Sequence, residues 1–424
     1  MSPHAHREKD PLAWCVLLAL AFVALAWVRL AIPSTEYFDE IHYLPAARAL
    51  LDLSEWRNQE HPMLGKELLA VGIWLFGDTS FGWRILPLLA GGGTLFALMR
   101  ATWFATWSRF ATLTGGLLLA TGFILFILSR IAMLDIFMLF FAALAIWQLA
   151  GAVRQPERGR GRLALAGMAL GCAMGAKWNV LPIVPLPGLA FLAWRIRAGG
   201  WRFAFTHRGA PVPGVTLAEA ALWLGLVPLV VYALTFTPAL YIHGSNLGDV
   251  GLIEHHRYMF KLQESVTKPH AYMSTWRNWI VDERPIWFLY HETDGAQRGI
   301  LMLGNPFSML LGLPALLWCL WAGLFRKRRD ALAVFILYAV SFGFWIVAEK
   351  PVQFYYHYAL PSMFLLIALA LALDAAWRAG WRKVALAVLA INCAVFVWFY
   401  PIISAAPLAG PQSFNHWMLV KSWR

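Results

Sequence analysis

The chain has 424 residues, of which 60% are hydrophobic and only 14% are charged. An average soluble domain has about 25% charged residues, so this composition excludes an ordinary soluble protein. The basic residues exceed the acidic ones by 12, and in a soluble protein such an excess would suggest nucleic-acid binding. In a chain with repeated apolar runs, the question is instead which side of a membrane carries the charges.

Apolar runs of about 20 residues recur along the whole chain, and each is long enough to cross a hydrocarbon core of about 30 Å as a helix. The pattern therefore predicts an all-α polytopic membrane protein. Eleven spans are predicted, at residues 12–32, 81–101, 108–128, 131–150, 163–179, 180–197, 216–237, 300–324, 331–348, 359–377 and 384–400. The first run lacks a small-x-small cleavage site, so we expect it to remain as a helix.

The segments between the predicted spans divide unequally in charge. Those on one side carry 19 of the 35 basic residues and six of the 23 acidic ones, which leaves 16 basic and 17 acidic residues on the other side. Because basic segments are retained in the cytoplasm, the N-terminus is predicted to be cytoplasmic. The C-terminal tail, residues 401–424, is then predicted to lie outside.

Two outer segments, residues 33–80 and 238–299, are too long to be simple connectors. In the first, apolar residues recur at helical spacing within 41–51 and 64–75, which predicts two amphipathic helices on the membrane surface. The second is rich in aromatic residues, which favour the headgroup level of a membrane. These are Tyr272, Trp276, Trp279, Trp287 and Tyr290. The polar chemistry is therefore expected on the outer face.

Adjacent carboxylates follow the first span at Asp39 and Glu40. A carboxylate at the membrane surface can accept a proton from an incoming hydroxyl if its pKa is suitable. The alternative is an acidic helix N-terminus that favours the helix dipole. The same outer segment contains Glu60, His61 and Lys66, for which the alternative is a turn followed by a snorkelling lysine.

Charged residues also occupy the outer ends of predicted spans, at Arg84, Arg130, Asp135 and Lys177. Such charges cost several kcal/mol unless they face a polar cavity or a partner, so each is a candidate site residue. Snorkelling to the interface is the alternative for the basic ones. Arg130 and Asp135 are about 140° apart around a helix and need not pair with each other.

A short outer segment between the ninth and tenth spans adds Lys350, Tyr356 and His357. The aromatic residues alone would form an interface belt, whereas Lys350 and His357 can donate hydrogen bonds to an anion. A base beside cationic groups suits the transfer of a group from a phosphate to a hydroxyl. Because we see no phosphate-binding loop of the G-x-x-x-x-G-K-[ST] type and no soluble nucleotide-sugar domain, we expect the phosphate to arrive on a lipid.

Six short motifs occur in a fixed order along the chain. They are Phe38-Asp39-Glu40-Ile41-His42, His61-Pro62-Met63-Leu64-Gly65-Lys66, Trp83-Arg84-Ile85-Leu86-Pro87, residues 130–135, Leu303-Gly304-Asn305-Pro306 and Tyr356-His357-Tyr358-Ala359-Leu360-Pro361. Their order and spacing resemble the protein O-mannosyltransferase family from the first span to the tenth. The resemblance implies a single type C glycosyltransferase (GT-C) membrane domain over residues 1–424.

The resemblance also implies an activity and roles for residues. The expected enzyme is a hexosyltransferase that moves mannose from a polyprenyl phosphate to an acceptor hydroxyl with inversion, and the expected acceptor is a protein Ser or Thr. Asp39 resembles the catalytic base, Glu40 beside it supports the acceptor or the base, and Arg84 matches a functionally important arginine. The candidates around the donor phosphate and sugar are His61, Lys66, Arg84, Arg130, Asp135, Lys350 and His357, with Glu60, Lys177 and Tyr356 as further candidates.

The expected partners are a polyprenyl-phosphate sugar, an acceptor protein or envelope glycan, and membrane lipid, without nucleic acid. The sequence assigns no cofactor, and a divalent cation, Mg²⁺ or Mn²⁺, remains open because the acids near Asp39 offer oxygen ligands. Met63 replaces the second proline of the family's usual His-Pro-Pro, and no β-trefoil domain follows the seventh span. These departures predict a bacterial member, in the inner membrane with its active site on the periplasmic face.

Two other functions remain open at this stage. The first is a transferase of the same fold that modifies lipid A or another envelope glycan. The second is a lipid or solute transporter, although transporters often show inverted repeats and charges at the membrane midplane. We find no repeat in the chain, and its ionisable residues gather at one face.

Overall fold

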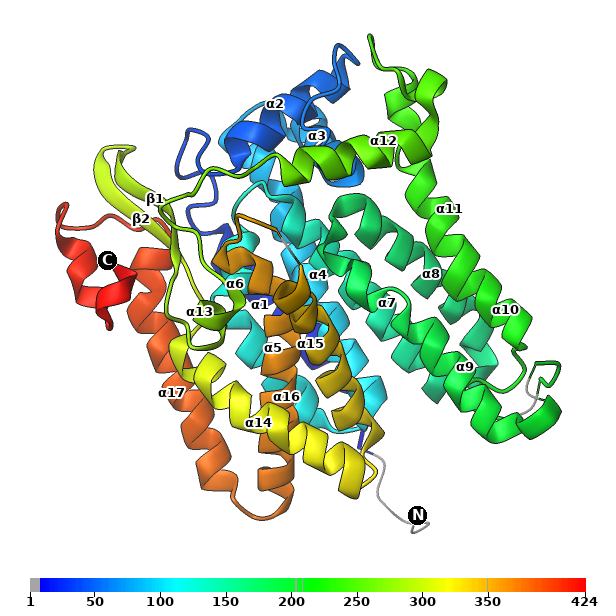
Figure 1. Cartoon of the computed structure of the whole chain (residues 1–424). Helices are drawn as coiled ribbons and strands as arrows, with labels where there is room; N and C mark the ends of the chain where they lie inside the picture. Colours follow the sequence, from blue (N-terminus) through cyan, green and yellow to red (C-terminus); the bar gives the residue numbers. More distant parts are fainter. Residues whose placement is uncertain (1–7, 203, 208, 349) are drawn as a thin grey trace.

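The computed structural model describes residues 8–202, 204–207, 209–348 and 350–424. Long helices run roughly side by side, and shorter elements gather at one end of the bundle (Figure 1). The helices of the first half are α1 (Leu12–Trp27), α2 (Glu40–Leu51), α3 (Leu64–Phe76), α4 (Ser80–Thr106), α5 (Arg109–Ala120), α6 (Ile124–Leu128), α7 (Leu134–Arg154), α8 (Gly159–Ala176) and α9 (Leu186–Gly199).

The second half adds further helices and one antiparallel hairpin. These elements are α10 (Leu217–Ala221), α11 (Val227–Leu234), α12 (Leu247–Glu264), α13 (Trp276–Ile280), β1 (Ile286–Thr293), β2 (Ala296–Met302), α14 (Pro306–Phe325), α15 (Arg329–Val347), α16 (Ala359–Arg378) and α17 (Arg382–Ile403). Strands β1 and β2 pair with each other from Ile286↔Met302 to Thr293↔Ala296.

Within the described ranges, eight helical segments are long and apolar enough to cross a membrane. Each of them falls on a predicted span. The other three predicted spans fall on α1, α5 and α8, and of these α1 and α5 are apolar helices of only 16 and 12 residues. The prediction of a helical polytopic membrane protein is therefore confirmed, while the count of eleven spans stays a prediction.

The span predicted at 300–324 begins too early. Residues up to Met302 belong to β2, and α14 starts at Pro306 after Asn305, whose side chain accepts a 3.2 Å hydrogen bond from the Phe307 amide. Proline is favoured in a first helical turn because it has no N–H to satisfy there. The hairpin, which the all-α prediction lacks, turns at Asp294 and Gly295, whose φ angles of 48° and 71° suit a tight hairpin turn.

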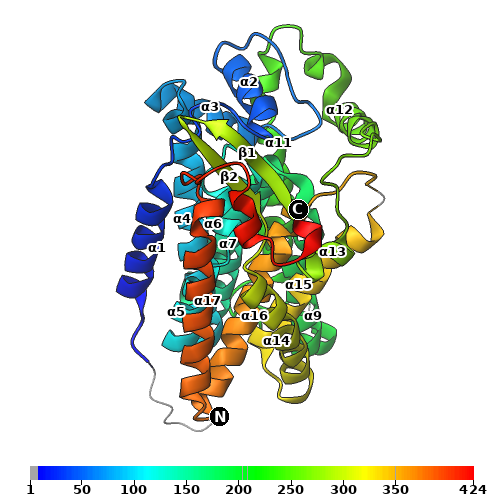
Figure 2. The same ribbon diagram turned by 90° about the vertical axis from the view of Figure 1, so that its left-hand side faces the viewer.

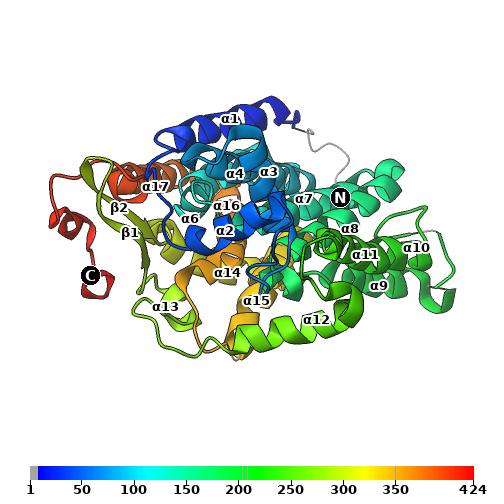
Figure 3. The same cartoon turned by 90° about the horizontal axis from the view of Figure 1, so that it is seen from above.

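The polar elements lie at one end of the bundle. Helices α2, α3 and α12 form a layer there with the β1–β2 hairpin beside it (Figures 1 and 2), and Figure 3 shows α2 near the centre of this layer, between α1 on one edge and α12 on the other. Helices α2 and α3 confirm that the first outer segment contains two helices at the predicted positions, while their place on the membrane surface stays a prediction. The α16–α17 turn and the described start of the chain lie at the opposite end.

Candidate active site

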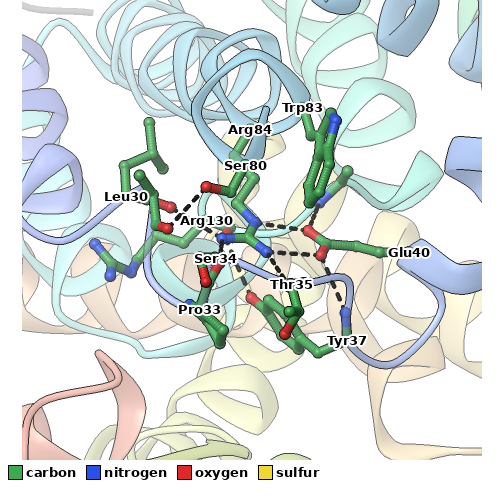
Figure 4. Close-up of polar contacts among 12 residues, drawn as sticks. Leu30, Pro33, Ser34, Thr35, Tyr37, Glu40, Ser80, Trp83, Arg84 and Arg130 are labelled. Carbon is green, nitrogen blue, oxygen red and sulfur yellow. Dashed lines mark hydrogen bonds and ion pairs between the residues drawn. The ribbon is translucent and has the colours of Figure 1, made fainter. Parts of the chain in front are cut away.

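A buried ion pair fixes the segment between α1 and α2. Arg84 of α4 donates from Nε and Nη2 to the two carboxylate oxygens of Glu40, each at 2.8 Å, and both side chains are fully buried (Figure 4). Glu40 also accepts a 2.9 Å hydrogen bond from the amide of Ala132, which precedes α7. Glu40 therefore joins its own loop to two other parts of the bundle.

The remaining donors of Arg84 hold the same loop. Its guanidinium donates to the backbone carbonyls of Leu30 at 3.2 Å, Pro33 at 2.6 Å and Thr35 at 3.1 Å (Figure 4). With the two bonds to Glu40, all five N–H groups of this arginine are used. The geometry therefore gives Arg84 a role in holding the chain around residue 39, and no N–H group is left for a phosphate.

Arg130 lies in a comparable setting. Its two terminal nitrogens donate to the carbonyls of Ala26, Val28, Arg29 and Ser404. It does not pair with Asp135, in agreement with their spacing along the chain. Contact of Arg130 with the donor stays a prediction, because the structure shows it tying the end of α1 to the residues after α17.

Asp39 differs from its neighbour Glu40. Its side chain is half-buried, and its carboxylate has no hydrogen-bond or ion-pair partner among the residues that the structure describes. Desolvation raises the pKa of Asp39 to about 6; the charge of Lys177 lowers it and that of Asp135 raises it. A carboxylate that is free, partly accessible and titrates near neutral pH has the properties of a general base.

Phe38 determines how Asp39 is presented. It adopts the left-handed region with φ of 52°, which is uncommon for a residue other than glycine. Its ring stacks on Phe288 of β1 at 4.0 Å and lies 5.9 Å from the Tyr356 ring. The hairpin therefore contacts the loop that carries Asp39 directly, which the sequence does not predict.

A second buried ion pair lies near Asp39. Lys177 Nζ donates to Asp135 Oδ2 at 2.6 Å, and both side chains are almost fully buried. Lys177 follows α8 in an extended conformation, while Asp135 lies in the first turn of α7. The other oxygen, Asp135 Oδ1, is buried with no hydrogen-bond partner in the described structure. It is available to accept a hydrogen bond from a ligand hydroxyl.

Lys350 approaches the same place from the loop before α16. Its ammonium donates to Gln263 Oε1 of α12 at 3.1 Å. Burial lowers the pKa of Lys350 to about 8, and Lys177 lowers it further, while the carboxylates of Asp135, Asp39 and Glu60 raise it. Lys350 therefore places a cation near Asp39, with donors left for an anion.

Gln263 links Lys350 to the loop before α3. Its Nε2 donates to the Glu60 carbonyl at 2.8 Å and lies 3.5 Å from His61 Nδ1. Burial lowers the pKa of His61 well below its usual value, and the positive charges of Lys177 and Lys350 lower it further. The sequence interpretation did not identify Gln263, because a neutral residue on an amphipathic helix carries no signal of its role.

Lys66 and Glu60 support this loop from within. Lys66 Nζ donates to the carbonyls of Asn58 at 2.6 Å and His61 at 2.9 Å, and burial lowers the pKa of Lys66 to about 7. Glu60 accepts a 2.6 Å hydrogen bond from the Asn58 side chain. Both residues therefore shape the loop that carries His61, and direct contact of either with the donor stays a prediction.

Tyr356 and His357 complete the surroundings of Asp39. The Tyr356 ring lies 5.1 Å from Lys177 Nζ and 4.6 Å from the His357 ring. Nδ1 of His357 lies within 3.0 Å of the Phe354 backbone, which fixes the ring and leaves Nε2 for a ligand. Trp279 is fully buried beside His357, and its indole N–H donates to Ser274 at 2.9 Å; its position at the headgroup level stays a prediction.

The structure thus sorts the predicted site residues into two groups. Around Asp39 it brings together Asp135, Lys177, Lys350, His61, Tyr356 and His357. Glu40, Arg84 and Arg130 form a second, buried group that holds the chain around residues 26–40 in place. Within the described ranges, no group of three or more His, Cys, Asp or Glu side chains has the arrangement of a metal site.

Comparison with known families covers most of the chain. The family model described as dolichyl-phosphate-mannose-protein mannosyltransferase matches residues 76–242, and the model described as the C-terminal four TMM region of protein-O-mannosyltransferase matches residues 250–423. The chain belongs to the protein O-mannosyltransferase family. The family resemblance predicted from the ordered motifs is confirmed.

Family members from bacteria and yeast are similar over most of their length. The polyprenol-phosphate-mannose–protein mannosyltransferase of Corynebacterium glutamicum is 27% identical, over 88% of this chain and 84% of the relative. The structure of the S. cerevisiae protein O-mannosyltransferase Pmt1-Pmt2 complex bound to the sugar donor superposes with a TM-score of 0.79 at 14% identity, covering 98% of this chain and 93% of that one.

A second kind of GT-C protein shares the fold less closely. The structure of ArnT from Cupriavidus metallidurans bound to undecaprenyl phosphate superposes with a TM-score of 0.60 at 18% identity. It covers 93% of this chain but only 66% of the ArnT chain. The predicted GT-C fold is therefore confirmed for this family member.

Proposed function

We propose that this chain transfers mannose from a polyprenyl phosphate to a hydroxyl group of a protein. The support is the family membership together with relatives that are named for this activity and match nearly the whole chain. A GT-C transferase acting on lipid is the other candidate. It is less favoured because 93% of the yeast protein O-mannosyltransferase chain is covered, against 66% of the ArnT chain.

The observation that carries the mechanism is the difference between Asp39 and Glu40. Glu40 accepts hydrogen bonds from Arg84 and two backbone amides, whereas Asp39 has no such partner in the described structure. We assign Asp39 as the general base that takes the proton of the acceptor hydroxyl. Glu40 and Arg84 act as positioning residues, because they hold the loop that presents Asp39 and their own polar groups are already engaged.

The reaction follows as a single displacement. The acceptor oxygen loses its proton to Asp39 and attacks the anomeric carbon, the new carbon–oxygen bond forms, and the bond from that carbon to the phosphate oxygen breaks. The polyprenyl phosphate leaves with the electron pair of that bond, and cationic donors stabilise its charge. The positive charges of Lys177 and Lys350 both act on Asp39, so we assign these two lysines as the cationic donors, and His357 Nε2 is a donor or acceptor for the sugar.

Location and orientation extend the proposal. Eight candidate spans in the described ranges and the membrane-embedded relatives make this an integral membrane protein. We place it in a bacterial inner membrane, with the basic end of the bundle in the cytoplasm and the layer of α2, α3 and α12 in the periplasm. The bias of basic residues toward one end supports this orientation.

The role of a divalent cation, Mg²⁺ or Mn²⁺, stays open. Asp135 is paired with Lys177 through Oδ2, and among the described residues no group of three or more His, Cys, Asp or Glu side chains has the arrangement of a metal site. Treatment of the purified protein with EDTA, followed by assays with and without added Mg²⁺ or Mn²⁺, measures the dependence directly.

The experiment that tests the proposed function uses the purified protein, polyprenyl-phosphate mannose with a labelled sugar, and an envelope extract. Label recovered in Ser or Thr residues of peptides by mass spectrometry supports protein mannosylation. Label in lipid A or another glycolipid assigns the chain to the other kind of acceptor. No transfer to any acceptor overturns the proposal.

A further inference from the structure

The structure contains a cavity far from Asp39, at the opposite end of the bundle. Its volume is about 670 Å³, and it lies between α5, α16 and α17, where the α16–α17 turn closes that end (Figure 1). Gly380 in this turn has φ of 93°, a conformation that glycine adopts without steric cost. The tight turn brings the last residues of α16 against the first residues of α17.

Three arginines line this cavity, and two of them have no counter-ion. Arg378 is paired with Asp374 at 2.9 Å and lies 3.8 Å from Glu8. Arg109 and Arg382 also line the cavity, but their guanidinium groups have no hydrogen-bond or ion-pair partner in the part of the chain that the structure describes. The two acids in the lining are already engaged, because Asp374 also accepts from Ser108 at 2.6 Å and Glu8 from the Arg109 amide at 2.6 Å.

Aromatic rings hold one of these free cations in place. The Arg382 guanidinium lies over the Trp377 ring at 5.4 Å, and Trp377 stacks on Phe110 at 4.2 Å. The two stacked rings therefore connect α16 with the beginning of α5, and both line the cavity beside the arginines. An arginine kept over an aromatic ring retains N–H groups at its edge for an anion.

The lining becomes apolar away from the arginines. Leu113 and Leu117 line the cavity one and two turns along α5 from Arg109, and Leu389 lies about two turns along α17 from Arg382. The side chains that line the cavity are thus charged at the end of the bundle and apolar toward its middle. A small soluble anion would use only the charged part, whereas an amphipathic molecule matches both.

We propose that this cavity binds an anionic phospholipid. Its phosphate lies between Arg109 and Arg382, and an acyl chain follows Leu113, Leu117 and Leu389. Basic pockets between membrane helices bind the head groups of anionic lipids. Each Lys or Arg near an anionic membrane surface raises the affinity by about fivefold. The proposal does not depend on the transferase reaction, because the cavity is at the other end of the molecule from Asp39.

The test measures lipid binding to the full-length protein by native mass spectrometry in detergent. Phosphatidylglycerol is titrated against wild-type protein and the Arg109→Gln/Arg382→Gln variant. We expect saturable binding to wild type and a loss of affinity of about 10-fold or more in the variant, with much weaker binding of zwitterionic phosphatidylethanolamine to both. A thermal melt of the variant checks that it is folded.

The matched control is Arg197→Gln/Arg326→Gln, which removes two exposed arginines from helix ends outside the cavity. Arg326 also lies over a tryptophan, Trp321, at 5.4 Å, so the control removes the same kind of contact. The control should bind phosphatidylglycerol as wild type does. Equal loss in both variants, equal binding of the two lipids, or displacement of the lipid by inorganic phosphate at comparable affinity would overturn the proposal.

Discussion

Asp39 and Glu40 are consecutive residues with opposite hydrogen-bonding states. Glu40 is fully buried and bound to Arg84 through both carboxylate oxygens, whereas Asp39 is half-buried and its carboxylate has no partner in the described structure. Two neighbouring acids therefore serve different purposes. One holds the loop in place, and the other remains available for chemistry.

Removal of Arg84 should destabilise the protein strongly. The Arg84→Gln variant leaves the carboxylate of Glu40 buried without its cation and frees three loop carbonyls, and breaking a buried ion pair costs about 3–5 kcal/mol. Thermal unfolding in detergent measures the change. Arg160→Gln, which breaks the exposed 2.7 Å pair with Glu219, is the control and should cost less than about 1 kcal/mol. Equal effects of the two variants would contradict the positioning role.

Variants of the Lys177–Asp135 pair should affect stability and transfer activity differently. In Lys177→Gln, Asp135 keeps a buried charge without a partner, so we expect a loss of about 3 kcal/mol of stability together with loss of transfer. The double variant Asp135→Asn/Lys177→Gln removes both charges and should recover most of the stability while transfer stays low. Recovery of transfer along with stability would show that the pair is only structural.

Gln263 is expected to act through Lys350. In Gln263→Ala, the ammonium of Lys350 loses its 3.1 Å acceptor and the loop at Glu60 loses a donor. Hydrogen bonds to charged groups are worth about 1.5–3 kcal/mol, so the KM for the polyprenyl-phosphate donor should rise by about 10-fold with a smaller change in kcat. Lys261→Ala on the same helix is the control and should leave both unchanged. A fall in kcat alone would contradict this role.

The pH dependence of kcat/KM should be bell-shaped. Asp39 must be deprotonated to act as a base, and its pKa of about 6 means that the rate rises as pH increases through that value. Lys350 must be protonated to stabilise the phosphate, and its pKa of about 8 means that the rate falls above that value. In Lys350→Arg, the alkaline limb should move to higher pH, because arginine keeps its charge. An unchanged alkaline limb would exclude Lys350 as its source.

Much of the fold could be predicted from apolar spacing. The helical spacing around Leu44 and Leu69 predicts α2 and α3, and long apolar runs predict the membrane helices. The hairpin is harder to predict although Asp294-Gly295 is a known hairpin signal, because β2 ends in an apolar run that also resembles the start of a span.

The site was harder to predict than the fold. The sequence indicates Asp39 and Glu40 as candidate site residues. It also indicates Arg84 as a buried charge that needs a partner, but it does not say whether that partner is a phosphate or a glutamate. The contact of Arg84 with Glu40 joins residues 44 positions apart, and that of Lys177 with Asp135 joins residues 42 apart. Neither pairing follows from local spacing, so the division into positioning residues and residues around Asp39 required the three-dimensional arrangement.

The assignment of Asp39 as the base is tested most directly by the turnover of Asp39→Asn with a saturating polyprenyl-phosphate mannose donor and an acceptor peptide. Thermal unfolding and donor binding show whether the variant is intact, and Asp52→Asn, an exposed change at the end of the same helix, serves as the control. The account predicts a loss of at least about 100-fold in kcat for Asp39→Asn and none for the control. A variant that folds, binds the donor and turns over at the wild-type rate would contradict it.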